Sequence, residues 1–208
     1  LNRFVISATN HGVSRRLLKY PVIKLDLAGA SPLCQSLPPE TVPTDSSELS
    51  LQVMTAPPLA AVILAAGLGT RMKSTLPKVL HPLAGRPMLQ HLAASLAELE
   101  PARLIVVTAP DMQVVADALP AARMAVQYPA LGTGHAVLAA RAELAGFTGD
   151  VMVLYGDTPL LRPATMQAML AMRRRGMIVV VLGFRPQDPG AYGRLVVDAD
   201  GGLSRIVE

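Results

Sequence analysis

The sequence predicts an α/β fold, a mostly parallel sheet with helices on both faces. The apolar run 60–65 is followed by a glycine-rich stretch, which is typical of a buried parallel strand that leads into a loop. Strand-like and helix-like segments then alternate, which indicates parallel strands joined by crossover helices. With 51% hydrophobic and 16% charged residues, the 208 residues hold enough apolar material for one core and are not disordered throughout.

Each later element has its own signal. The first helix is predicted over 87–99, where four leucines have helical spacing and Pro87 suits the first turn. Gly176 closes the last helix, predicted over 163–175. The remaining elements follow from the same periodicities: strands at 104–108, 124–127, 151–155 and 178–184, helices at 111–119 and 133–144, and a hairpin with strands at 195–197 and 203–207.

Residues 1–53 differ in composition from the rest of the chain. They contain Pro38-Pro39 and a Ser/Thr/Pro-rich stretch, without a sustained period of 2 or 3.6. The Arg-rich, acid-poor start resembles a transit peptide, but no amphipathic helix accompanies it. We therefore expect 1–53 to be a disordered or artefactual extension, and Met54 to be the natural start of a domain over 54–208.

Composition and charge exclude several classes of protein. The single cysteine, Cys34, rules out an internal disulfide and suits a reducing compartment, so we expect a cytoplasmic protein. The apolar runs are far shorter than the roughly 20 residues that a bilayer requires. A net charge of +4 suits a phosphate-bearing ligand but is too mild to indicate nucleic acid, and the 3% of aromatic residues argues against base stacking.

The loop after the first strand, 64–72, is a candidate ligand site, because open α/β sheets bind ligands beyond the carboxyl ends of their strands. Its glycines let backbone N–H groups approach an anion, and Arg71 adds a bidentate cation. Met72 excludes a dinucleotide fingerprint, which needs a glycine or alanine at this position, and a P-loop, which needs a glycine. A phosphate-binding loop of another kind and a plain tight turn remain open.

The stretch of sequence that includes the end of this loop is basic. Residues 71–86 contain four cations and no acid: Arg71, Lys73, Lys78 and Arg86. Such a group can neutralise a triphosphate, although a solvated basic loop is an equally good interpretation. Pro77 fixes the backbone just before Lys78 and helps to orient that side chain.

Two further loops follow predicted strands. Gln127 has an amide that can bind a base edge, and the glycines of 131–134 allow a ring to lie close to the backbone, whereas His135 is more typical of packing. Asp157 follows an apolar strand, where a lone carboxylate beside phosphates suits Mg²⁺. Capping of the next turn is the alternative for Asp157.

Together the loops resemble those of a known family. Leu-Ala-Ala-Gly-Leu-Gly-Thr-Arg-Met at 64–72 with Leu-Pro-Lys at 76–78 is similar to the motif of sugar-phosphate nucleotidyltransferases. The longer text narrows the resemblance to the N-terminal domain of bifunctional bacterial N-acetylglucosamine-1-phosphate uridyltransferase/glucosamine-1-phosphate acetyltransferases. The stretches that carry it are 76–88, Gln127, 131–136, 154–160, 192–194 and 206–208.

The resemblance implies a Rossmann-like sheet of the nucleotidyltransferase type, incomplete at the C-terminus, and it implies roles for particular residues. Arg71 and Lys78 would be catalytic, through the charge of the triphosphate and pyrophosphate, and Asp157 would hold Mg²⁺. The family's second metal ligand, its acetyltransferase domain and the homotrimer that this domain forms would lie beyond Glu208. The implied nucleotide- and sugar-binding residues are Leu64, Ala65, Ala66, Gly67, Gly69, Thr70, Gln127, Gly132, Thr133, Tyr155, Gly156, Gly193 and Glu208.

The implied reaction transfers UMP from UTP to N-acetylglucosamine 1-phosphate, giving UDP-N-acetylglucosamine and pyrophosphate for bacterial cell-envelope synthesis. Positioning two anions and neutralising their charge supplies most of the acceleration, so no general base is assigned. Another sugar-phosphate nucleotidyltransferase is one alternative, and an inactive, truncated nucleotide-binding remnant is another. No nucleic acid or membrane partner is expected.

Overall fold

The computed structural model describes residues 3–7, 20–24, 56–67, 72–185, 187–188, 190, 192–199 and 202–207, the first two ranges by their backbone. Its helices are the 3₁₀ helix η2 (Lys78–Leu80), α1 (Met88–Ala97), α2 (Gln113–Ala118), α3 (Thr133–Ala139) and α4 (Pro163–Arg174). Its strands are β1 (Arg3–Ser7), β2 (Tyr20–Lys24), β3 (Leu59–Leu64), β4 (Pro82–Leu83), β5 (Arg86–Pro87), β6 (Arg103–Thr108), β7 (Arg123–Val126), β8 (Asp150–Tyr155), β9 (Val180–Gly183), β10 (Arg194–Val197) and β11 (Gly202–Val207).

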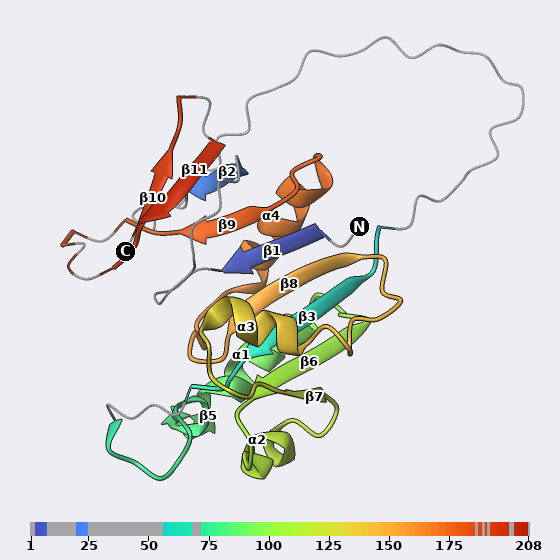
Figure 1. Cartoon of the computed structure of the whole chain (residues 1–208), viewed down its shortest axis with the longest axis vertical. Coiled ribbons are helices and arrows are strands. Elements are labelled where there is room, and N and C mark those ends of the chain that lie inside the picture. The colour runs from blue at the N-terminus through green and yellow to red at the C-terminus, as the bar shows by residue number, and fades with distance from the viewer. Residues whose placement is uncertain are drawn as a thin grey trace, which may run out of the picture.

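The main sheet has the strand order β10-β11-β2-β9-β1-β8-β3-β6-β7 (Figure 1). From β2 to β7 every pairing is parallel, whereas β11 runs antiparallel to both β2 and β10. The prediction of a mostly parallel sheet is confirmed, and so is the antiparallel hairpin near the end of the chain. Among the described residues, no helix is long and apolar enough to cross a membrane.

Helices cover both faces of the sheet, as predicted. Alternate residues of β3 explain this, because successive side chains of a strand point to opposite faces. Ala61 and Ile63 pack in a cluster with buried residues of α1, α2 and α4, whereas Ala60 and Val62 pack with α3 and the turns that follow it. Figure 1 shows α3 in front of the sheet with α1 and α4 behind it.

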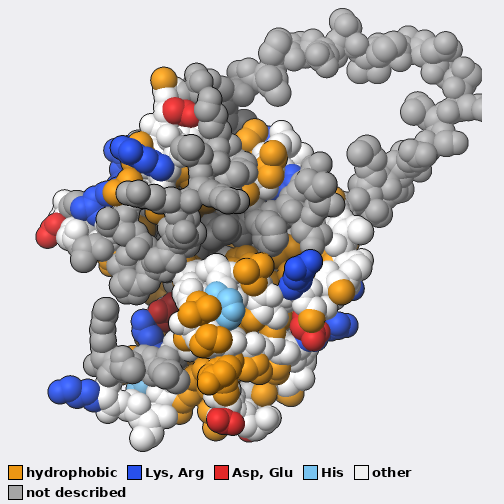
Figure 2. All heavy atoms as spheres, viewed as in Figure 1, with side chains coloured by type: hydrophobic (Ala, Val, Ile, Leu, Met, Phe, Trp, Pro, Cys, Tyr) orange, Lys and Arg blue, Asp and Glu red, His pale blue; other side chains and the backbone are white. Residues whose placement is uncertain are grey.

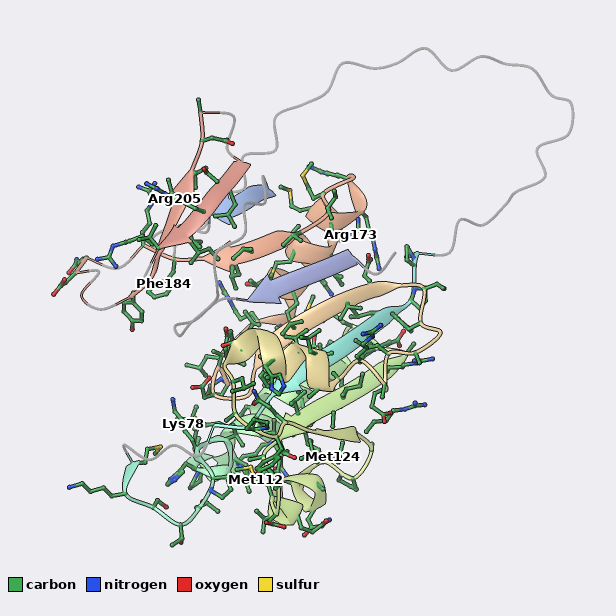
Figure 3. The ribbon with its side chains drawn as sticks, in the orientation of Figure 1. Lys78, Met112, Met124, Arg173, Phe184 and Arg205 are labelled. Atoms are coloured by element: carbon green, nitrogen blue, oxygen red, sulfur yellow. The ribbon has the colours of Figure 1, made fainter. Side chains whose placement is uncertain are left out.

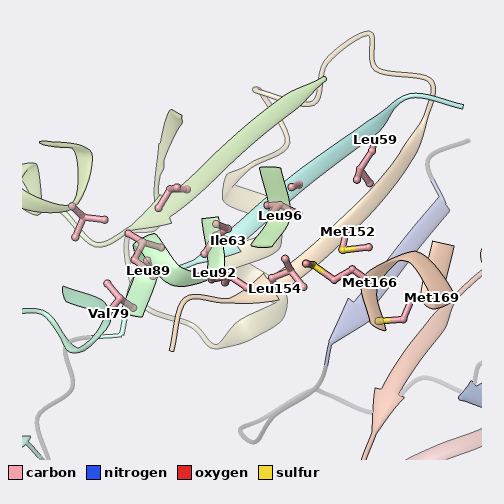
Figure 4. Packing of buried hydrophobic residues seen from close by; sticks show 14 of the residues in the cluster. Leu59, Ile63, Val79, Leu89, Leu92, Leu96, Met152, Leu154, Met166 and Met169 are labelled. Carbon is pink, nitrogen blue, oxygen red and sulfur yellow. The ribbon is translucent and has the colours of Figure 1, made fainter. Parts of the chain in front are cut away.

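The larger cluster depends on the leucine spacing of α1. Leu89, Leu92 and Leu96 are fully buried and face Ile63, Leu154 and the methionines of α4 (Figure 4). Met166 and Met169, which are three residues apart on one face of α4, are fully buried as well and belong to the core. Burying side chains of this size contributes about 1.5–3 kcal/mol each.

Some predicted elements are shorter than expected, and small elements were not predicted. The helix predicted to 144 ends as α3 at Ala139, and turns continue while still burying Leu144. The hairpin of β4 and β5 is closed by Ala84 and Gly85, which both have positive φ, as in the tight two-residue turns of hairpins.

The structure also differs from the expectation for residues 1–53. The sequence predicted no regular structure there, whereas β1 pairs in parallel with β8 and β9, and β2 pairs with β9. Both strands are short runs that contain valine and isoleucine, residue types that favour strands. Met54, the expected natural start, lies outside the described residues.

Candidate functional site

The loops that the sequence singled out begin at one edge of the sheet, where β3, β6, β7 and β8 end. The backbone N–H of Gly156 donates to the carbonyl of Leu64 at 2.9 Å, and that of Ala65 donates to the carbonyl of Val107 at 2.8 Å. The N–H of Gln127 donates to the carbonyl of Thr108 at 2.8 Å. These bonds continue the pairing past the strand ends, so the loops after β3, β7 and β8 start beside one another.

Gly156 is required where the loop after β8 meets η2. A Cβ at this position would lie 2.9 Å from Cγ1 of Val79 and 3.2 Å from the carbonyl oxygen of Leu64. Any larger side chain would push the loop away from β3 and η2. The close approach brings Asp157 next to Lys78.

Lys78 and Asp157 form an ion pair at this edge. The ammonium Nζ donates to Oδ2 of Asp157 at 2.6 Å, and the two side chains are 44% and 31% exposed. Lys78 opens η2, which is anchored by the buried side chains of Val79 and Leu80. Figure 3 shows Lys78 beyond the carboxyl ends of the central strands, with Arg173 at the opposite end of the sheet.

The surroundings of Asp157 suit a divalent cation that also binds phosphate. The turn around it is closed by Thr158, whose hydroxyl donates to the Tyr155 carbonyl at 2.6 Å, while the Asp157 carboxylate pairs with Lys78. Among the described residues there is no group of three or more His, Cys, Asp or Glu side chains that forms a metal cage. One partly exposed carboxylate fits Mg²⁺, which takes one or two carboxylates with phosphate oxygens and water.

The loop after β7 is organised by Gln127, which is only 5% exposed. Its Nε2 donates to the carbonyl of Gly132 at 3.0 Å and lies 3.3 Å from Nδ1 of His135. Gly132 has a φ of 93°, which glycine adopts without strain, and it precedes Thr133, the first residue of α3. The amide nitrogen of Gln127 therefore holds the loop in shape, and His135 packs against it as expected.

Exposed apolar side chains surround this loop. Tyr128 is 79% exposed and Leu131 is 68% exposed, and neither was singled out from the sequence. Figure 2 shows hydrophobic side chains gathered on the part of this face where α3 and β7 lie. The signal available in the sequence was a large apolar residue on each side of Pro129-Ala130.

The other predicted site residues divide into three groups. Leu64, Ala65, Ala66 and Gly67 follow one another at the end of β3, and a Cβ at Gly67 would meet nothing within 4 Å. Gly193 precedes β10, which is separated from β8 by four strands in the sheet order, so it lies on another part of the sheet. The remaining predictions lie outside the described residues: Gly69, Thr70, Arg71 and Glu208.

A second charged cluster lies at the opposite edge of the sheet. Asp150, which is 2% exposed, pairs with Arg174 at 3.3 Å and with Arg173 at 3.5 Å. Both arginines lie in the last turn of α4, a helix that the sequence predicted without revealing this buried partner. Two of the three consecutive arginines therefore pair with an internal carboxylate.

Open parallel α/β sheets bind ligands beyond the carboxyl ends of their strands, and the Lys78–Asp157 pair lies there, beside the start of the loop after β3. Residues 61–199 match the family model described as the MobA-like NTP transferase domain. The chain belongs to this family and carries a nucleotidyltransferase domain.

Similar sequences agree with the resemblance found from the motifs. The chain is 58% identical over 157 residues to "Bifunctional protein GlmU" of Paramagnetospirillum magneticum, a match covering 74% of this chain and 35% of the relative. It is 55% identical over 151 residues to the protein of the same name from Rhodospirillum rubrum, covering 72% and 34%. The chain thus spans about a third of the length of the curated relatives it matches.

Solved structures share the fold at lower identity. HddC from Yersinia pseudotuberculosis has a TM-score of 0.56 and 24% identity, covering 72% of this chain and 68% of that protein. Rv0371c from Mycobacterium tuberculosis has a TM-score of 0.50 and 23% identity, covering 59% and 63%. These similarities confirm the α/β fold of the nucleotidyltransferase type.

Proposed function

We propose that these residues form the nucleotide-binding part of an enzyme that transfers UMP from UTP to N-acetylglucosamine 1-phosphate. The observation that carries the proposal is the Lys78–Asp157 pair, with Nζ and Oδ2 2.6 Å apart at the carboxyl edge of the sheet. It gives one cation for phosphate and one carboxylate for a metal at the same point. Relatives 52–58% identical to the chain support the choice of reaction.

In the proposed reaction, a phosphate oxygen of the sugar phosphate attacks the α-phosphorus of UTP. The bond from that phosphorus to the bridging oxygen breaks, and pyrophosphate leaves with the electron pair. Lys78 binds the phosphates and neutralises the charge that develops on the leaving group, with Arg71 in the same role. Bound at Asp157, Mg²⁺ would supply further positive charge to the phosphate oxygens.

The loop from Gln127 to Thr133 is proposed to bind the base. Gln127 holds the loop through Gly132, and the exposed faces of Tyr128 and Leu131 offer an apolar surface on which a flat ring can lie. Gly193 and Glu208 are proposed to contact the sugar. The cytoplasmic location expected from the sequence, and a homotrimer in the longer protein, are further parts of the proposal.

Pyrophosphate release tests the reaction. The 208-residue chain is compared with a chimera that continues into the remaining part of the domain of the Paramagnetospirillum magneticum relative, and with that relative as the positive control. We expect release by the chimera only when UTP, N-acetylglucosamine 1-phosphate and Mg²⁺ are all present. The 208-residue chain should show little release, because the second metal ligand of the family is expected beyond Glu208.

Substitution of the nucleotide separates the alternatives. Faster release with CTP, GTP or dTTP than with UTP would show another sugar-phosphate nucleotidyltransferase. A folded chimera that releases no pyrophosphate with any of these nucleotides would indicate the inactive remnant and would contradict the proposed function.

A further inference from the structure

We propose that the Lys78 ammonium takes the place of a divalent cation at Asp157, so that the protein excludes free metal and accepts metal together with a nucleotide. The inference rests on the proposed function for the identity of the site. It concerns how that site is controlled before substrate arrives. Three observations carry it: the contact itself, the fixed backbones on both sides, and the absence of acids in the basic loop.

The first observation is that Lys78 already occupies the carboxylate. Its Nζ lies 2.6 Å from Oδ2 of Asp157. Mg²⁺ binds carboxylate oxygens at about 2 Å, so a cation on this oxygen would lie within about 5 Å of the ammonium. The two positive charges would repel each other strongly in a site that is only partly open to water. Metal binding at this oxygen therefore requires the lysine side chain to move.

The second observation is that neither backbone can withdraw easily. On one side, η2 buries Val79 and Leu80, and the N–H of Leu80 donates to the Pro77 carbonyl at 2.9 Å. On the other, Gly156 packs so closely against Val79 that a Cβ would not fit. Exchange of the cation is thus left to the lysine side chain, which is flexible and 44% exposed.

The third observation is that the basic loop offers Lys78 no second carboxylate. Residues 71–86 contain no Asp or Glu. When the ammonium leaves Asp157, no carboxylate of this loop can receive it, whereas a bound nucleotide triphosphate supplies an anion. Metal and triphosphate therefore bind cooperatively. The triphosphate draws the Lys78 ammonium away from Asp157, and the metal takes its place on the carboxylate.

The test is the affinity of the 208-residue chain for Mn²⁺ without nucleotide, measured from the electron paramagnetic resonance signal of free Mn²⁺. Lys78→Gln removes the ammonium but keeps a polar side chain, so Mn²⁺ should bind about five- to tenfold more tightly. Lys78→Arg keeps the charge and should bind as weakly as the unmodified chain. Adding Asp157→Asn to Lys78→Gln should abolish the gain.

Lys73→Gln is the matched control, because it removes the same charge from an exposed position on the same loop. We expect it to change the affinity less than about twofold. Equal affinities in Lys78→Gln and the unmodified chain would overturn the inference, as would an equal gain in Lys73→Gln. Pyrophosphate release tests the proposed reaction separately, so a failure of the reaction and a failure of the cation exchange give different results.

Discussion

Lys78 and Asp157 lie far apart in the sequence, yet their side chains meet at 2.6 Å. The position of each is set by its own local structure: Lys78 is the first residue of η2, and Asp157 lies in the loop after β8. The contact between them depends on Gly156, which lets the two loops touch. A single small residue therefore sets the geometry of the charged pair.

Loss of one charge-stabilising group should slow the proposed reaction strongly. In the chimera, Lys78→Ala and Arg71→Ala should each lower turnover by roughly 10²–10³, the range for loss of one preorganised charged group. Arg141→Ala, at an exposed position after α3, is the control and should leave turnover near that of the unmodified chimera. Turnover unchanged in Lys78→Ala would mean that the loop is only a turn.

Gly156→Ala should destabilise the protein as well as displace Asp157. The added methyl would lie 2.9 Å from Val79, and such overpacking costs about 1–3 kcal/mol in the free energy of unfolding. Gly134→Ala is the matched control, since its Cβ meets nothing within 4 Å and α3 favours alanine. Urea unfolding measures both, and equal stabilities would contradict the close packing.

At the scale of residues, the sequence singled out candidate site residues but not the contacts between them. Lys78, Gln127 and Asp157 were candidates because they lie at or beyond the ends of predicted strands, and their roles came from the resemblance to a known family. The hydrogen bond from the Gln127 amide to the Gly132 carbonyl could not be predicted, because it depends on the path of the loop between the two residues. Tyr128 and Leu131 were missed because exposure depends on packing that no local pattern encodes.

At the scale of elements, prediction succeeded where a helical period or a continuous apolar run extends over several residues. The leucines of α1 and the continuous apolar runs of β3 and β8 defined these elements within about two residues at each end. The hairpin of β4 and β5 was missed because two-residue strands carry no period. β1 and β2 were missed because their pairing partners lie more than a hundred residues away.

The fully buried face of α1 should dominate its contribution to stability. Leu92→Ala should lower the free energy of unfolding by about 2–5 kcal/mol, because it leaves a cavity between α1 and the sheet. Leu138→Ala, at a position 64% exposed on α3, should change it by less than about 0.5 kcal/mol. Denaturant unfolding checks both, and similar losses would show that the two helices do not bury the faces described.

At the scale of the whole molecule, β1 joins two parts of the sheet. It lies between β8 and β9, and β2 lies between β9 and β11. The central strands β8, β3, β6 and β7 pair without either of them. The strands beyond β8 are therefore connected to the centre through residues that precede the region matched by the family model.

Removal of residues 1–53 should therefore affect one side of the sheet and not the other. In a chain that begins at Met54, backbone amides of β9 and β11 should lose protection from hydrogen exchange, because β1 and β2 no longer pair with them. Amides of β6 are the internal control and should stay protected. Unchanged protection of β9 would instead support the extension expected from the sequence.

The position of β1 also has a consequence for the order of events during synthesis. β1 is synthesised before the other described strands, but its register pairs Arg3 with Asp150 and Val5 with Val180, so its place in the sheet exists only after β8 and β9 have been made. Closing a loop of that length is slow compared with local pairing. Residues 3–7 therefore stay unpaired, and accessible to chaperones and other nascent chains, until β9 has been synthesised and can pair with them.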